Sequence, residues 1–176
     1  MRVRLETVTN LALLTVAVLI IANISRNWVL VKRGTPVATS RNPPQVYVVG
    51  DTFEALPAVD FSATSRTAVL FFRTSCGFCS KSMPFYKRLH DALEASLDGA
   101  RLVVVGSEAV GEISSYFKAQ GISLDSVIST PAADPKVPGT PTLVFVDSRG
   151  TVENVWVGLL TAEQEDAVLG FVKHEA

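Results

Sequence analysis

The sequence is poor in residues that hold metals or crosslink small folds, with two cysteines and two histidines among 176 residues. A secreted protein stabilised by disulfides would need more cysteines, spread along the chain. A structural zinc site would need two further ligands, and His90 and His174 lie far apart in the sequence. The sequence therefore predicts no metal site and no bound cofactor. It leaves Cys76 and Cys79 to pair with each other as a redox-active disulfide.

Charge is divided unevenly along the chain. Residues 1–44 contain six Lys/Arg and one acidic residue, a net charge of +5, whereas residues 45–176 contain ten and sixteen, a net charge of -6. The acidic part has no basic patch laced with aromatic residues, so we expect no nucleic-acid partner. A basic segment beside an acidic domain suits a membrane surface better.

An uncharged apolar run extends from Val8 to Ile24, with Arg2 and Arg4 before it. Its length is at the short end of what a membrane-spanning helix needs, and it predicts a single transmembrane anchor. A cleaved signal peptide is the main alternative, but its apolar region should be shorter and end in small residues, unlike Ala22-Asn23-Ile24-Ser25. A buried core helix fits neither the N-terminal position nor the flanking charges.

Four sections follow from this pattern: a flank (1–7), a transmembrane anchor (8–24), a linker rich in Pro, Ser, Thr and Gly (25–45), and a globular domain (46–176). Two basic residues precede the anchor, and four follow it within residues 25–41. Counted alone, these charges would place the domain in the cytoplasm.

Short apolar runs predict strands at 68–73, 102–105, 142–147 and 152–157, and residues 47–49 as a further N-terminal strand. Helical spacing predicts three helices, with apolar faces at Met83, Tyr86, Leu89, Leu93 and Leu97, at Val110, Ile113 and Phe117, and at Val168, Phe171 and Val172. Thr161 and Gln164 resemble a capping box that starts the last helix. The order β-α-β-α-β-β-α predicts an α/β fold with a central mixed sheet and helices on both faces.

The motif Cys76-Gly77-Phe78-Cys79 follows a predicted buried strand and opens a predicted helix. Unpaired N–H groups and the dipole at a helix N-terminus favour a thiolate, which is the attacking species in disulfide exchange. Cys76 is therefore the expected nucleophile, and Cys79, one turn later, the resolving residue. Gly77 would reduce crowding, and Phe78 would offer a partner an apolar surface. The alternative is that both cysteines merely pack as small apolar residues.

With this motif, residues 46–172 resemble the thioredoxin superfamily, and most closely its membrane-tethered, extracytoplasmic TlpA/ResA branch. Pro84 stands where this family kinks the active-site helix, because its ring would clash with the Ser80 carbonyl. Gly139-Thr140-Pro141-Thr142 is similar to the family's GTPT motif. The resemblance implies a thioredoxin-like fold and a cis peptide between Thr140 and Pro141 that faces the cysteines. It also implies that the Thr140 backbone pairs with a bound peptide.

Three positions depart from the family's pattern. Leu70 replaces the buried Asp of thioredoxins, Ser82 replaces a Glu common in the TlpA/ResA branch, and Ser75 stands where Trp is usual. Neither proton-handling carboxylate can be carried over. Glu108 is a candidate base at the edge of the motif, although such a residue is more often simply solvated.

Arg73 and Lys81 are candidates for stabilising a thiolate, although charges on a protein surface are common. His90 lies on a helix with many charges, which predicts a solvated surface residue.

The resemblance implies a thiol-disulfide oxidoreductase on the extracytoplasmic, periplasmic side of a membrane, against the simple charge count. It would reduce disulfides of proteins, with apocytochromes as candidates, and receive electrons from a membrane donor. A peroxiredoxin-like peroxidase would need P-x-x-x-T/S-x-x-C, but Val69 and Arg73 occupy those positions. A copper carrier could use two thiolates, but no histidine or methionine cluster accompanies them.

Overall fold

The computed structural model describes residues 46–53, 56, 59–96, 99–124, 126–131 and 136–173. The predicted flank, anchor and linker (1–45) lie outside these residues, so those interpretations remain predictions. Within the described ranges, no helix combines the length and the hydropathy needed to cross a bilayer.

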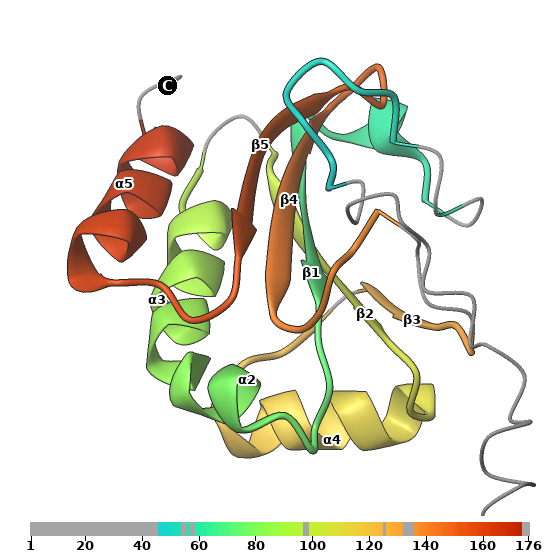
Figure 1. Cartoon of the computed structure of the whole chain (residues 1–176), viewed down its shortest axis with the longest axis vertical. Helices are drawn as coiled ribbons and strands as arrows, with labels where there is room; N and C mark the ends of the chain where they lie inside the picture. Colours follow the sequence, from blue (N-terminus) through green and yellow to red (C-terminus); the bar gives the residue numbers. More distant parts are fainter. Residues whose placement is uncertain are drawn as a thin grey trace, which may run out of the picture. The chain divides into compact units, whose positions relative to one another are not determined.

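A five-stranded mixed sheet forms the centre of the domain (Figure 1). Its strands are β1 (Arg66–Phe71), β2 (Arg101–Gly106), β3 (Ser126–Ser129), β4 (Thr142–Asp147) and β5 (Val152–Val157), in the order β3-β2-β1-β4-β5. β1, β2 and β3 pair in parallel, whereas β4 is antiparallel to both β1 and β5. The sheet therefore has the parallel core and antiparallel hairpin that the sequence predicts.

Two features of the sheet differ from the prediction. β3 was not predicted, because its four residues include only two apolar ones, between two serines. The predicted strand at 47–49 is wrong: no strand is assigned there, and Val48 and Val49 are exposed. The nearest pairing is an isolated bridge between Thr52 and Thr151.

The helices are α2 (Gly77–Lys81), α3 (Met83–Glu94), α4 (Val110–Ala119) and α5 (Ala162–Lys173), preceded by a short 3₁₀ helix, η1 (Phe61–Ala63). The expected single helix after the cysteines is divided at Ser82. Pro84 occupies the first turn of α3, where a missing N–H is tolerated. The capping box of α5 is confirmed, because Thr161 N–H donates to Gln164 Oε1 at 2.9 Å and Gln164 N–H donates to Thr161 Oγ1 at 3.4 Å.

The two faces of the sheet are covered differently. Ala68, Leu70 and Phe72 point into one core cluster, which also contains the buried residues of α3, α4 and α5. Val69 and Phe71 point into a second cluster. α3 and α5 lie side by side on one side of the sheet (Figure 1).

The second core cluster contains no residue of α2–α5 in the part of the chain that the structure describes. Its cover comes from the segment that precedes β1, through Tyr47, Phe53, Leu56 and Phe61. The expected arrangement with α-helices on both faces is therefore wrong for the described residues. Aromatic and aliphatic side chains from an irregular segment bury this face instead.

Candidate active site

Cys76 lies at the junction between β1 and α2, at the N-cap position of the helix. β1 is buried on both faces, and the turn of residues 73–75 carries the chain from its end to α2. The Cys76 N–H donates to the Arg73 carbonyl at 3.1 Å, and the Cys79 N–H points at Cys76 Sγ at 3.4 Å. The sulfur of Cys76 thus takes the place that a serine or aspartate oxygen takes in an ordinary N-cap.

Cys79 lies on the first turn of α2, three residues after Cys76, and its side chain is fully buried. Cys76 is half-buried, and both cysteines are free thiols in the structure. Burial raises the pKa of Cys79 to about 11, against opposing hydrogen bonds from the Arg73 backbone and the Thr140 side chain. Cys79 is therefore held as a thiol at neutral pH.

The pKa of Cys76 is below its ordinary value. Partial burial opposes the charged form, but hydrogen bonds from the side chain and backbone of Cys79, the Thr140 side chain and the Phe78 backbone outweigh it. These donors cluster at the N-terminus of α2, where N–H groups lack partners within the helix. The geometry makes Cys76 the better thiolate of the pair.

The loop before β4 brings Thr140 and Pro141 to the cysteines. The Thr140–Pro141 peptide bond is cis, as the resemblance implied. In its thiol form, Cys76 Sγ donates to the Thr140 carbonyl at 3.2 Å. The Pro141 carbonyl accepts from Gly158 N–H at 2.8 Å, which ties this loop to the chain after β5.

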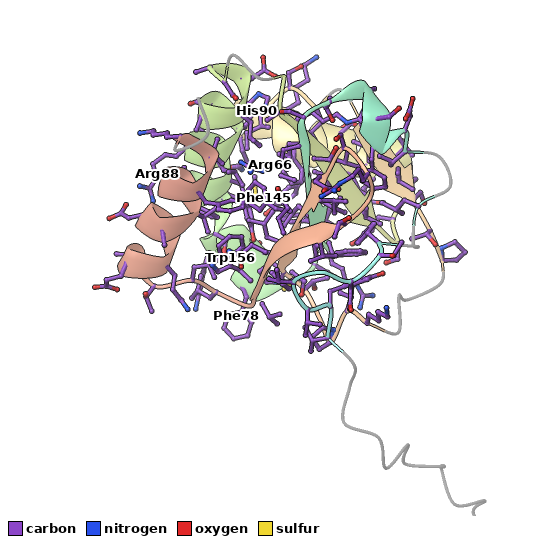
Figure 2. The ribbon with its side chains drawn as sticks, turned by 90° about the horizontal axis from the view of Figure 1, so that it is seen from above. Arg66, Phe78, Arg88, His90, Phe145 and Trp156 are labelled. Atoms are coloured by element: carbon purple, nitrogen blue, oxygen red, sulfur yellow. The ribbon has the colours of Figure 1, made fainter. Side chains whose placement is uncertain are left out.

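The two residues between the cysteines face outward. A Cβ added at Gly77 would meet no heavy atom within 4 Å, so the space beside Cys76 is open. The Phe78 side chain is 57% exposed, and Figure 2 shows its ring at the surface, directed away from the core. Lys81 Nζ lies 5.9 Å from the centroid of this ring. Gly77 and Phe78 therefore present an open, partly apolar surface next to the half-buried thiol.

Glu108 lies just past β2 and contacts the turn that carries Cys76. Its Oε1 accepts from Thr74 N–H at 2.9 Å and from Thr74 Oγ1 at 3.1 Å. Glu108 lies at the edge of the motif, as expected. It is not simply solvated, because its carboxylate accepts hydrogen bonds from Thr74. Thr74 was not singled out from the sequence; a hydroxyl two residues before Cys76 was the available signal.

No carboxylate replaces the missing proton-handling residues at their own positions. Leu70 is fully buried in the apolar core, and Ser82 is buried with its hydroxyl donating to the Phe78 carbonyl at 3.0 Å. Tyr86 is buried nearby; burial raises the pKa of its phenol, a hydrogen bond with the Ser82 side chain opposes the rise, and charge on either cysteine would reinforce it. Ser82 and Tyr86 therefore contribute neutral hydroxyls, not carboxylates.

His90 and Arg73 are the remaining polar candidates from the sequence. His90 is half-buried on α3, not fully solvated as expected, and Figure 2 places it at the opposite end of the molecule from Phe78. Arg73 is exposed on the turn before Cys76. Among the described residues, no group of three or more His, Cys, Asp or Glu could hold a metal ion.

Solved structures share this fold, although no family model and no curated protein matches the chain. A Chlorobium tepidum protein described as the thiol:disulfide interchange protein DsbE is 26% identical, with a TM-score of 0.52, over 70% of this chain and 99% of that one. The thioredoxin domain of a thiol-disulfide oxidoreductase from Bacteroides vulgatus is 15% identical, with a TM-score of 0.58, over 72% and 99%.

A second Chlorobium tepidum structure, a thiol:disulfide interchange protein of the thioredoxin family, is 24% identical, with a TM-score of 0.52, over 77% of this chain and 99% of that one. The fold and these comparisons place the chain in the thioredoxin superfamily. Together with the dithiol at the start of α2, they indicate an enzyme of the thiol-disulfide oxidoreductase class.

Proposed function

We propose that this chain is a membrane-tethered reductase of protein disulfides that works through the Cys76–Cys79 dithiol. One observation carries the proposal. A half-exposed Cys76 with a lowered pKa stands at the N-terminus of α2, next to a buried Cys79 with a raised pKa. In a pair arranged in this way, Cys76 can attack a partner disulfide and Cys79 can then resolve the mixed disulfide.

The reaction proceeds in two exchanges. The Cys76 thiolate attacks one sulfur of a partner disulfide, forming a mixed disulfide and releasing the other partner sulfur as a thiolate. Cys79 then loses its proton and attacks Cys76 Sγ, which forms the Cys76–Cys79 disulfide and releases the second partner thiol. Two electrons pass to the partner, the proton of Cys79 goes to one released sulfur, and the other takes up a solvent proton in place of the one Cys76 lost on ionising. A membrane-bound dithiol donor then restores the reduced pair.

The proposed setting is the extracytoplasmic side of a membrane, with the 8–24 run as the anchor. The substrates are disulfides of proteins on that side, with apocytochromes as candidates. Thr140 would pair with the substrate backbone next to Cys76, and Gly77 and Phe78 would contact the residues that flank the substrate cysteine.

Trapping tests this proposal. The Cys79→Ser variant of the full chain should accumulate mixed disulfides with partner proteins, because nothing resolves them, and a reducing agent should release the adducts. The Cys76→Ser variant is the matched control and should trap little, because Cys79 is buried. If neither variant traps protein while the wild type consumes peroxide or binds copper, disulfide exchange is the wrong function.

A further inference from the structure

The turn that carries Cys76 is tied to the sheet by a side chain. Phe72 N–H still donates to the Val105 carbonyl at 2.8 Å, continuing the pairing of β1 with β2. Two residues later, the Thr74 N–H donates instead to the carboxylate of Glu108. The backbone that leads into Cys76 is therefore fixed by a residue 34 positions after Thr74.

The contact between Glu108 and Thr74 consists of strong hydrogen bonds. Glu108 Oε1 accepts from both donors of Thr74, at 2.9 Å and 3.1 Å, and Oε2 accepts from Ser107 Oγ at 3.4 Å. Burial opposes the charged form, but the backbone of Glu108 itself, the two Thr74 donors and the positive charge of Arg73 hold the pKa of Glu108 below its usual value. Hydrogen bonds to an ionised acceptor are roughly twice as strong as neutral ones.

Gly106, the last residue of β2, makes this approach possible. A Cβ there would lie 2.7 Å from Ile113 Cδ1, 3.0 Å from the Phe72 carbonyl and 3.2 Å from Glu108 Oε2. A side chain at this position would push β2 away from the end of β1. The close approach of the two strand ends thus brings the carboxylate to the turn.

We propose that Glu108 is a positioning residue for Cys76. Its carboxylate holds Thr74, and through the turn it keeps Cys76 Sγ within reach of the N–H groups at the start of α2. Cys76 lies two residues after Thr74, so a relaxed turn would carry the sulfur away from the Cys79 N–H, now 3.4 Å distant. The inference rests on the proposed function only in treating Cys76 as the attacking thiol.

A positioning role and a simple charge effect predict opposite results. Removing a negative charge near a thiolate should lower the pKa of Cys76, whereas releasing the turn should raise it. In the full-length protein, we expect Glu108→Ala to raise the pKa of Cys76 by about half to one unit and to slow its alkylation at neutral pH about three- to tenfold. The measurement is the pH dependence of iodoacetamide labelling at Cys76, followed by mass spectrometry.

Matched variants control this experiment. Glu108→Gln keeps an acceptor oxygen and should rescue part of the loss, whereas Glu112→Ala removes an exposed carboxylate of α4 and should change nothing. Thr74→Val removes the hydroxyl donor, and its effect should disappear in a Glu108→Ala background, since both changes break the same contact. If Glu108→Ala does not fold, Glu108→Gln and Thr74→Val still decide the question.

A pKa of Cys76 that is unchanged or lowered in Glu108→Ala relative to Glu112→Ala would overturn the proposal, as would effects of Thr74→Val and Glu108→Ala that simply add. Trapping by Cys79→Ser is scored separately. Trapping together with an unchanged pKa would leave the proposed function in place and reject the role of Glu108. A shifted pKa without trapping would do the reverse.

Discussion

Cys76 and Cys79 are three residues apart, yet their surroundings differ sharply. Cys76 is half-buried at the start of α2, among donors that lower its pKa. Cys79 is fully buried one turn later, and burial raises its pKa to about 11. One helical turn therefore separates a sulfur suited to attack from a sulfur held as a thiol.

The difference teaches that a symmetric motif acquires asymmetric chemistry from its place in the fold. The helix N-terminus supplies N–H groups to the first cysteine, whereas the core supplies low polarity to the second. The turn before Cys76 is polar and tied to Glu108, whereas the region around Cys79 contains Leu70 and neutral hydroxyls.

The largest effect on stability should come from Phe72→Ala, because Phe72 belongs to the core cluster that contains Cys79 and against which Cys76 packs. Phe72 is fully buried and contacts the rings of Tyr86 and Phe117, with centroid distances of 6.4 Å and 4.8 Å. Phe72→Ala should lower the free energy of unfolding by about 3–5 kcal/mol, because it leaves a cavity. Phe78→Ala removes an exposed ring of the same size and should change it by less than about 0.5 kcal/mol. Urea unfolding of the two variants measures this, and equal losses would contradict the assignment of Phe72 to the core.

A direct test of the comparison is the labelling rate of the two thiols. With a pKa of about 11, Cys79 is a thiolate in only about one molecule in ten thousand at pH 7. Iodoacetamide should therefore label Cys76 about a hundredfold faster or more. The rate at Cys79 should rise about tenfold for each pH unit up to pH 11, so the gap should narrow in alkali. Equal rates at neutral pH would break the comparison.

Thr140→Val should raise the pKa of both thiols. Burial remains the largest influence on each pKa, but the Thr140 side chain lowers both. Removing its hydroxyl should raise both values by up to about one unit and leave the order of labelling intact. Thr161→Val, at the distant cap of α5, is the control. A reversal of the order would show that Thr140 creates the asymmetry.

The smallest effect should follow from Tyr116→Phe. The Tyr116 hydroxyl donates to Ser80 Oγ at 3.0 Å, and Ser80 Oγ donates to the Cys76 carbonyl at 3.2 Å. The variant removes only the first of these bonds, which is exposed, so the loss should cost about 1 kcal/mol or less. Labelling of Cys76 should change less than about twofold. A tenfold loss would show that α4 positions Cys76 as firmly as Glu108 is proposed to do.

Much of the sheet could be predicted because β1, β2 and β4 contain continuous apolar runs. The predicted 142–147 and 152–157 coincide with β4 and β5, and β1 and β2 are shifted by at most two residues. β3 was not predicted because only two of its four residues are apolar, and its place in the sheet comes from pairing with β2. The predicted strand at 47–49 is wrong because Val48 and Val49 are apolar but exposed.

The site was predictable in part. Cys76 at a helix N-terminus and the capping box of α5 depend on neighbours within four residues, and such local contacts are visible in a sequence. The contact between Thr74 and Glu108 joins residues 34 apart, and no spacing rule indicates it. Its partner could be found only once β1 and β2 were paired in parallel.

The sequence alone determined four of the five strands in the described sheet, the helix that starts at the CxxC motif, and the types of residue at the site, because these depend on local patterns and short-range contacts. The helix N-terminus already indicated Cys76 as the thiolate, whereas tertiary structure decided how fully Cys79 is buried and what Glu108 holds. Burial and charge at one atom sum over groups that only the folded chain brings together. The two cysteines have the same chemistry in the sequence and different chemistry in the protein.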